Sequence, residues 1–260
     1  MTRISEPQDV QCCICKTNNK VRFVYSASIF SGPDLDTRPA FMARYNIIYE
    51  VNACKNCGYC NIDLDKEIFG AKKVIQSPVY QKRLKKRKNP KKANEFSCLA
   101  IIFESKGDIV QAGWKYLNAA WICDDKKMQK QGVEKIKADE ENKGNNSKKL
   151  ILTPQIIAYG KCAATFRQKA LEKFQSALKI NKPIMKTRGE ERLLFTDINR
   201  RTGEFNIAEK ICFMAQTKKL NQNIRRLLNY ELHLCKIKDD TCHNIEDGME
   251  YNGEIAGNKQ

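Results

Sequence analysis

Histidine is scarce in this chain of 260 residues, which contains only His233 and His243. Both lie far along the sequence from the paired cysteines, and no nucleophile motif accompanies either of them. Neither a phosphate-binding glycine loop nor a dinucleotide-binding glycine fingerprint is present. The sequence therefore indicates no catalytic group, and we expect a protein that is not an enzyme and has no identified small-molecule substrate.

Long apolar segments are also missing. No run of about 18 apolar residues occurs, which is the minimum for a helix that crosses a membrane. The first ten residues contain no apolar stretch typical of a signal peptide. We therefore expect a cytoplasmic protein with reduced thiols and no membrane partner.

Acidic residues are outnumbered: 30 Asp and Glu stand against 47 Lys and Arg, for a net charge of +17. Such a balance favours anionic partners, nucleic acid among them. The excess is carried mostly by lysine in a chain also rich in asparagine and isoleucine, so a general compositional bias explains it equally well. A length of 260 residues allows one large or two modest domains, and a hydrophobic content of 42% supports a core.

Four of the twelve cysteines form two C-x-x-C pairs, Cys12 with Cys15 and Cys54 with Cys57. Two such pairs supply the four thiolates that a tetrahedral zinc ion needs. Four cysteine ligands close the coordination sphere, so we expect one structural Zn²⁺ that folds the N-terminal region and activates no water. Gly58 suits the turn after the second pair, whereas Lys16 occupies the equivalent position after the first.

Other interpretations of these cysteines stay open. A disulfide pair disagrees with a reducing compartment, and a thiol redox site needs a C-x-x-C that opens a helix after a strand. Cys13 and Cys60 each lie close enough in sequence to replace a neighbouring ligand.

Residues 21–25 and 45–51 resemble short strands, which predicts a β-hairpin between the two pairs, as in a zinc ribbon.

The segment between the pairs contains a turn-rich loop at residues 29–39. It brings Asp34, Asp36 and Arg38 close together in sequence. We favour a clamp between arginine and the carboxylates that fixes the loop against the ribbon, and a recognition surface is the alternative.

These motifs together resemble the DUF2225 family of bacterial proteins. The resemblance is carried by Cys-x-x-Cys, then Gly-Pro-Asp-Leu-Asp-Thr-Arg-Pro at 32–39, then Cys-Lys-Asn-Cys-Gly-Tyr at 54–59. It implies a cysteine-knuckle region followed by a helical-repeat region, and it implies no catalytic residue. Lys16 and Cys60 depart from the pattern.

A basic run follows at residues 82–92. Clustered cations of this kind form a solvated linker or helix face, or contact the phosphates of nucleic acid. Aromatic residues that would stack on bases are missing from the run. The candidate phosphate contacts are Lys82, Arg83, Lys85, Lys86, Arg87, Lys88, Lys91 and Lys92.

Helical repeats are predicted beyond the basic run. Small and aromatic residues from Phe96 to Ala119 match the tetratricopeptide (TPR) pattern, with a turn at Gly107 and Asp108. A weaker second unit would place Ile157 on one helix and Ala170 on the next. A third unit turns at residues 200–205, and residues 223–238 form a capping helix.

We therefore predict an α+β protein: a zinc-ribbon-like module with four cysteine ligands at 1–65, a basic linker or helix at 66–93, and a mainly α, TPR-like helical-repeat domain at 94–238. A helix extension and flexible loop are expected at 124–149, and a polar, frayed tail at 239–260. The favoured function is a zinc-binding adaptor for a protein or peptide partner. Nucleic-acid association through the zinc ribbon and basic run is the alternative, and a thiol redox protein or other enzyme is third.

Overall fold

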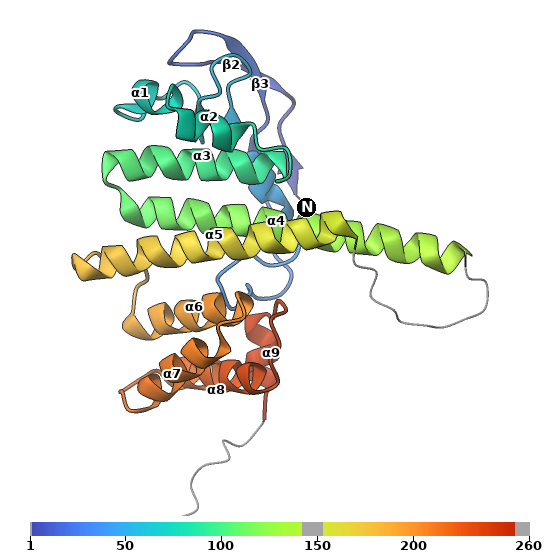
Figure 1. Ribbon diagram of the computed structural model, residues 1–260, viewed down its shortest axis with the longest axis vertical. Coiled ribbons are helices and arrows are strands. Elements are labelled where there is room, and N and C mark those ends of the chain that lie inside the picture. Colours follow the sequence, from blue (N-terminus) through green and yellow to red (C-terminus); the bar gives the residue numbers. More distant parts are fainter. Residues whose placement is uncertain (1, 142–152, 253–260) are drawn as a thin grey trace, which may run out of the picture. The chain divides into compact units, whose positions relative to one another are not determined.

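A computed structural model describes residues 2–141 and 153–252 (Figure 1). The described chain is mostly helical, with short strands confined to its N-terminal region, as the sequence predicts. The chain divides into two compact units that alternate along the sequence. We call residues 5–23 and 48–173 the cysteine unit, and residues 1–4, 24–47 and 174–260 the C-terminal unit.

The cysteine unit begins with two small hairpins. Strands β2 (Gln8–Gln11) and β3 (Asn18–Val21) pair antiparallel, and so do β5 (Asn52–Ala53) and β6 (Cys60–Asn61). The helices α1 (Ala71–Ile75), α2 (Pro78–Leu84), α3 (Lys91–Lys106) and α4 (Ile109–Glu141) follow. The first part of α5 (Pro154–Lys179) completes the unit.

Helix α3 is the centre of the cysteine unit. It packs against α1, α2, α4 and β6, and Phe96, Leu99 and Ala100 are fully buried. A helix that is buried on most of its circumference belongs to a core. Gly107 ends the helix with a left-handed φ of 81°, which reverses the chain into α4 as the sequence predicts. Ala112 and Ala119 of α4 are fully buried, because small side chains let the two helices approach closely.

The second predicted repeat is wrong. Ile157 and Ala170 were expected on separate helices, but both lie on α5, which continues from Pro154 to Lys179 without a break. The residues between them contain no proline, so nothing in the backbone forces a turn. The predicted extension at 124–149 is helical through residue 141, as the last part of α4, and the remainder of that range lies outside the described residues.

In the C-terminal unit, α6 (Arg188–Arg201), α7 (Phe205–Gln216) and α8 (Gln222–Lys236) pack on one another. The predicted turn between α6 and α7 is present, with Gly203 at a φ of 83°. Thr187 starts α6 with a capping box that includes Glu190. The same unit contains β1 (Arg3–Ile4) paired with β4 (Val24–Ser26).

A buried ionic cluster joins α6 to α8. The Arg200 guanidinium donates to Asp197 Oδ1 at 2.6 Å and to Glu231 Oε2 at 2.7 Å, and all three side chains are at most 1% exposed. Arg200 also donates to the carbonyls of Asp239 and Thr241, at 2.7 and 2.8 Å. One arginine therefore fixes both the helix pair and the segment that follows α8.

Two further predictions differ from the structure. Residues 45–51 were expected to be a strand, but a 3-10 helix, η1, spans Ala43–Tyr49, and of its residues only Ile47 is buried. Residues 239–252 were expected to fray, yet they include helix α9 (Ile245–Glu250). An Asn244–Asp247 capping box starts that helix, and it packs on α8. Local side-chain capping therefore orders a segment whose composition is polar.

Candidate metal centre

Each cysteine pair lies in the tight turn of its own hairpin. The N–H of Lys16 donates to the Cys12 carbonyl at 2.8 Å, and the N–H of Gly58 donates to the Cys54 carbonyl at 3.0 Å. The hairpins close in the same way, through Cys12 to the Thr17 carbonyl and Cys54 to the Tyr59 carbonyl. The two turns are thus equivalent, and each aims its two sulfurs to one side.

The hairpin that we expected between the two cysteine pairs is wrong. Strands β3 and β4 lie in this part of the chain, but β3 pairs with β2 and β4 pairs with β1. Both partner strands precede the first cysteine pair. These two strands therefore complete hairpins that begin before the first pair, and β5, which also lies between the pairs, joins β6 beyond the second pair.

The residue after each pair adopts the left-handed conformation. Gly58 has a φ of 75°, as its sequence position predicts, and Lys16 has a φ of 59° despite its side chain. Gly58 has a second role: a Cβ at this position would lie 2.4 Å from Leu84 Cδ2 of α2. The second turn therefore packs directly against α2, whose last residues belong to the basic run.

The four predicted cysteines come together. Their sulfurs all lie within 4.8 Å of one another, with Cys12 to Cys57 at 3.7 Å and Cys15 to Cys54 at 3.5 Å. Four sulfurs at about 2.3 Å from a central ion stand about 3.8 Å apart in a regular tetrahedron. The spacing of the cluster therefore suits a tetrahedral metal ion.

Asn19 supports the cluster and was not predicted as a site residue. Its Nδ2 lies 3.7 Å from Cys54 Sγ and donates to the Thr17 carbonyl at 2.8 Å, while its Oδ1 accepts from the Lys55 N–H at 2.9 Å. Asn19 and Val21 are the buried positions of β3, between exposed neighbours. An asparagine on the inward face of a short strand beside a cysteine turn is the pattern that would have identified it.

The four thiols differ in acidity. Burial opposes ionisation of Cys15, but hydrogen bonds, first from the side chain and backbone of Thr17, bring its pKa to about 5. Burial raises the pKa of Cys12, and burial together with the neighbouring cysteines raises that of Cys57. One thiolate therefore forms readily, whereas a fully ionised cluster needs a cation to balance its charge.

Cys13 and Cys60 lie outside the four-sulfur group. Cys60 is fully buried, and its sulfur donates to the Gly58 carbonyl at 3.4 Å. Tyr80 of α2 supports the same turn: its hydroxyl donates to the Gly58 carbonyl at 2.8 Å and accepts from the Cys60 N–H at 3.2 Å. These contacts give Cys60 a packing role beside the cluster.

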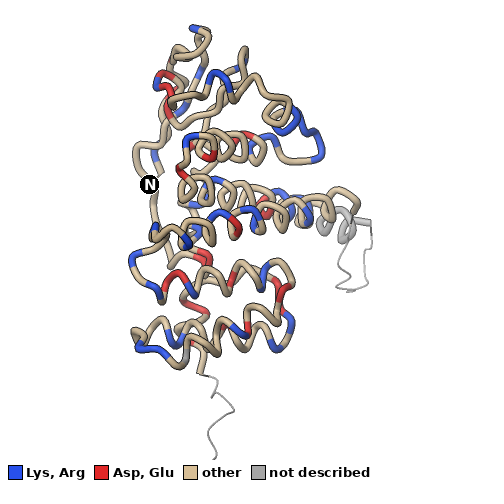
Figure 2. Tube along the Cα trace, turned by 60° about the vertical axis from the view of Figure 1, so that its left-hand side comes forward, with Lys and Arg blue, Asp and Glu red and all other residues tan. Residues whose placement is uncertain are grey.

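The basic run spans the end of α2, the turn after it and the start of α3 (Figure 2). Its cations have different surroundings. Lys92 pairs with Glu95 at 2.6 Å and donates to the Val51 carbonyl at 2.6 Å, so it joins α3 to the residue before β5. Lys91 lies 3.9 Å from Glu95. Arg83, Lys86 and Lys88 line a cavity against α5. The side chains of the run that lie outside this lining at Lys82, Lys85 and Arg87 are exposed, as are those of Lys86 and Lys88.

The loop containing Asp34, Asp36 and Arg38 is buried within the C-terminal unit, where all three residues are at most 3% exposed. Asp34 pairs with Arg44 at 2.6 Å, and it accepts a hydrogen bond from Cys242 Sγ at 3.0 Å. Its backbone pairs with that of Asn244. Arg44 and residues 242–244 hold Asp34 in the structure, whereas we expected a clamp between Arg38 and the carboxylates that fixes the loop against the ribbon.

His243 belongs to the same C-terminal segment. Its Nδ1 lies 2.8 Å from the Tyr230 hydroxyl, and its Nε2 lies 3.0 Å from Asp239 Oδ2. Nδ1 thus joins α8 to the chain beyond it, and Nε2 ties together two residues of that following segment.

Comparison of the chain with models of known protein families, with curated proteins and with solved structures finds no match. Among the described residues, no helix is both long and apolar enough to span a lipid bilayer.

Proposed function

We propose that the protein is a cytoplasmic adaptor whose N-terminal region is organised by one structural Zn²⁺ bound to Cys12, Cys15, Cys54 and Cys57. The observation that carries the proposal is the pair of equivalent turns that brings four sulfurs within 4.8 Å of one another. Thiolate ligands favour zinc over hard cations such as magnesium and calcium. Four protein ligands leave no open position for a substrate, so the ion acts on folding.

The zinc would stabilise the packing of the hairpins on the helices. Gly58 of the second turn contacts Leu84 of α2, and Tyr80 donates to the Gly58 carbonyl. Helix α2 in turn packs on α3, the central helix of the unit. Metal binding at the turns therefore transmits order to the helices through direct contacts.

The adaptor role rests on the helical hairpins. Helices α3 and α4, and helices α6 and α7, each form a hairpin with a left-handed glycine at or next to the turn and a fully buried alanine, Ala112 or Ala208, on the second helix. Such hairpins support a TPR-like architecture, although the continuous α5 replaces one predicted repeat. The DUF2225 resemblance remains a prediction that is compatible with this arrangement.

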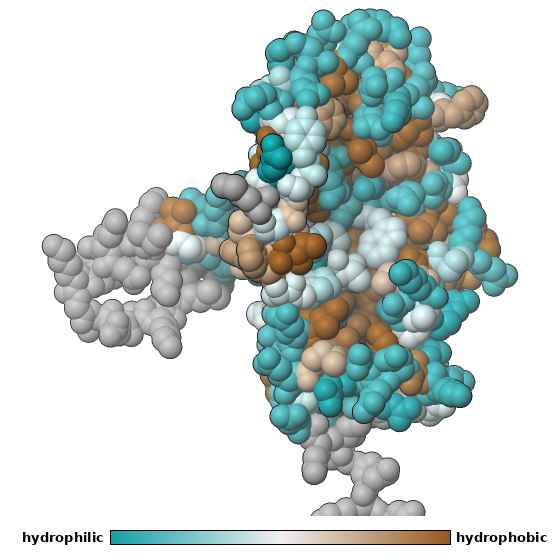
Figure 3. Space-filling view, turned by 180° about the vertical axis from the view of Figure 1, so that it is seen from behind, coloured by the Kyte–Doolittle hydropathy of each residue, from teal (hydrophilic) through white to brown (hydrophobic). Residues whose placement is uncertain are grey.

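Helix α7 offers a surface for a protein or peptide partner. Ile207 and Met214 are 46% and 69% exposed and lie two turns apart on one helix face, and Phe213 beside them is 50% exposed. Other exposed apolar residues lie outside α7, and Figure 3 shows hydrophobic residues gathered in patches on the face opposite to the view of Figure 1. Exposed apolar side chains on a helix face suit a partner that buries them.

Metal content tests the zinc proposal. Purified protein should contain one zinc per chain, and Cys54→Ser should lose it and make the region up to about residue 65 sensitive to protease while the remaining helices persist. Cys13→Ser is the matched control, because Cys13 neighbours a ligand but lies outside the group, and it should keep its zinc. Equal zinc content in both variants, or an unchanged protease pattern in Cys54→Ser, would contradict the proposal.

Peptide display tests the adaptor role. A random peptide library selected on zinc-loaded protein should yield binders that fail to bind a variant with Ile207→Ser and Met214→Ser. The control variant Ile237→Ser changes an isoleucine that is 58% exposed and lies outside α7, and it should keep the binding. Binders whose affinity is unchanged by all three substitutions would show that the partner does not bind at this face of α7.

Nucleic-acid association is the second candidate, favoured by the tie between the basic run and the second hairpin through Lys92 and Val51. Zinc-loaded protein would be titrated against labelled single- and double-stranded DNA and RNA by fluorescence anisotropy across a salt series. Binding that falls steeply with salt and is lost when Lys82, Lys85 and Arg87 are neutralised would support this function. Weak binding at physiological salt would refute it.

A further inference from the structure

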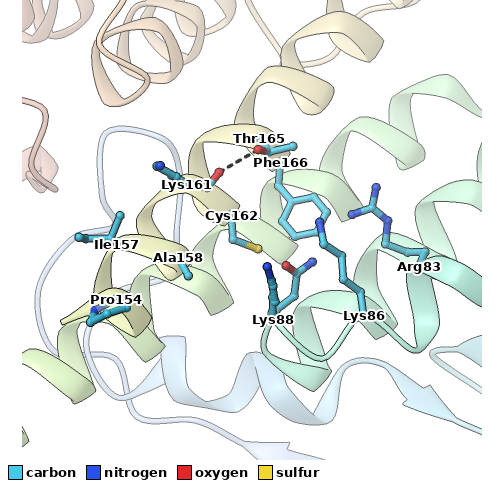
Figure 4. Close-up of a pocket in the computed structure, with 11 residues that line it drawn as sticks. Arg83, Lys86, Lys88, Pro154, Ile157, Ala158, Lys161, Cys162, Thr165 and Phe166 are labelled. Carbon is cyan, nitrogen blue, oxygen red and sulfur yellow. Dashed lines mark hydrogen bonds between the residues drawn. The ribbon is translucent and has the colours of Figure 1, made fainter.

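A cavity of about 330 Å³ lies in the cysteine unit, between the turn after α2 and the first part of α5 (Figure 4). Its volume is in the range of small-molecule sites. Arg83, Lys86 and Lys88 line it from the basic run, and Lys161 lines it from α5. No Asp or Glu is among the described residues that line it, so the cavity suits an anionic ligand.

Cys162 of α5 also lines this cavity, and its sulfur points toward the lysines of the basic run (Figure 4). It lies 2.8 Å from the sulfur of Cys123 on α4. Cys162 is 8% exposed, whereas Cys123 is fully buried. One thiol of the pair is therefore reachable from the cavity, and the other is shielded directly behind it.

The surrounding charges distinguish the two thiols. Contact with Cys123 lowers the pKa of Cys162 against the effect of burial, and Lys86 and Arg83 lower it further. Asp124 opposes this effect, but its carboxylate is paired with the buried Arg167 at 2.7 Å. Burial raises the pKa of Cys123. Cys162 is thus the thiol that ionises and attacks first.

We propose that Cys162 and Cys123 form a redox-active dithiol that reacts with small disulfides bearing carboxylates, which the basic cavity recognises. The Cys162 thiolate attacks one sulfur of the small disulfide, forms a mixed disulfide and releases one small thiolate. The Cys123 thiol then loses its proton, attacks Cys162 Sγ and releases the second small thiolate. Overall, two protein thiols are oxidised to one disulfide, and one small disulfide is reduced to two small thiols.

A second buried pair in the same unit provides an internal control. Cys60 and Cys98 are both fully buried and interact with each other, and burial raises the pKa of Cys60. Neither cysteine lines the basic cavity. If burial and proximity alone were sufficient for oxidation, this pair would react as Cys123 and Cys162 do.

The test treats the zinc-loaded, full-length protein with three disulfides at equal concentration: anionic glutathione disulfide, neutral 2-hydroxyethyl disulfide and cationic cystamine. Acid quenching, alkylation of free thiols and mass spectrometry of protease fragments then measure the Cys123–Cys162 cross-link. Each rate is divided by the rate of the same reagent with a small free thiol. We expect the normalised rate to be on the order of tenfold higher for the anionic than for the neutral reagent, lowest for the cationic one, and to converge at high salt.

Two sets of variants locate the reaction. Cys123→Ser, with Cys123→Ala as a second variant of this buried site, should trap the small thiol as a mixed disulfide on Cys162. Lys86→Gln with Lys88→Gln should abolish the preference for the anionic reagent. Lys82→Gln with Lys85→Gln removes the same charge from the same run but changes no residue that lines the cavity, so it should leave the preference intact.

The proposal is overturned if no reagent produces the Cys123–Cys162 cross-link, or if Cys60 and Cys98 cross-link equally fast. Equal normalised rates for the three reagents, or equal effects of the two lysine double variants, would refute recognition by the basic cavity.

Discussion

Two separate structural requirements, one of the backbone and one of packing, favour glycine at position 58, and the variant Gly58→Ala tests both. Its φ of 75° is a left-handed conformation, and a Cβ built there meets Leu84 Cδ2 at 2.4 Å. The variant therefore strains the backbone of the second cysteine turn and also pushes that turn away from α2. Both effects act on the hairpin that contains Cys54 and Cys57.

The two costs can be estimated separately. A non-glycine residue in the left-handed conformation costs roughly 1–2 kcal/mol, and overpacking a well-packed contact costs typically about 1–3 kcal/mol. Gly58→Ala should thus lower the free energy of unfolding by about 2–5 kcal/mol. Gly107 has a similar φ of 81° but nothing within 4 Å of a built Cβ, so Gly107→Ala should cost only the backbone part.

Urea unfolding at a fixed excess of zinc, followed by circular dichroism, measures these differences, and a chromogenic chelator follows zinc release in parallel. Gly58→Ala should be destabilised by about 1–3 kcal/mol more than Gly107→Ala. Leu84→Ala removes the clashing methyl group, so the double variant should be less destabilised than the sum of the two single variants.

The reasoning is refuted if Gly58→Ala and Gly107→Ala cost the same, because the contact with Leu84 would then have no steric consequence. It is equally refuted if Leu84→Ala adds its full cost on top of that of Gly58→Ala.

Three further substitutions test ionic contacts and helix packing within the fold. Hydrogen bonds from Thr241, helped by His243, hold the pKa of Asp239 at about 2 against the effect of burial, from an ordinary value of 3.8. A lowered carboxyl pKa stabilises the fold above about pH 4, and this stabilisation is lost as the pH falls toward 2. Asp239→Asn should therefore remove roughly 1–2 kcal/mol of acid-sensitive stability, after allowance for solvent screening, in thermal melts recorded across this range. A variant whose stability depends on acid as strongly as that of the parent would contradict this. Arg200→Met should cost about 3–5 kcal/mol in urea unfolding because it leaves the buried Glu231 carboxylate without its cation, and near-normal stability would show that the pair is dispensable. Ala112→Leu should lower the free energy of unfolding by about 1–3 kcal/mol in the same assay, because the larger side chain forces α3 and α4 apart. An unchanged stability would mean that the two helices are not tightly packed at this position.

The grouping of the four cysteine sulfurs could be predicted from the sequence, because cysteine spacing and a tight turn are local properties. The turn at Gly107 and the turn at Gly203 were predictable for the same reason, since each needs a left-handed residue. The partners of Asp34 and the contact between Cys123 and Cys162 were not predictable. Each joins residues on separate elements, 208 and 39 positions apart, and nothing in the local pattern marks the pairing.

The wrong predictions also have physical causes. Residues 45–51 are rich in the β-branched and aromatic residues that favour a strand, but η1 forms over Ala43–Tyr49 and buries only Ile47. Alanines that suggested two helices after residue 154 share one long helix because no residue breaks it. The segment after residue 239 has a polar composition, yet its Asn244–Asp247 capping box is visible in the sequence and would have predicted α9.

The alternation of the two units along the chain affects the order in which the protein can fold during its synthesis. Ribosomes add about 5–20 residues per second, so the 39 residues from Cys15 to Cys54 take roughly 2–8 s to appear. During that time the first cysteine pair has emerged without the second. The hydrogen-bond partner of Asp34 is synthesised later still, because Cys242 follows 208 residues after it, which takes roughly 10–40 s at the same rate. The early loop therefore remains an unfinished segment of the nascent chain until nearly all the rest has been translated.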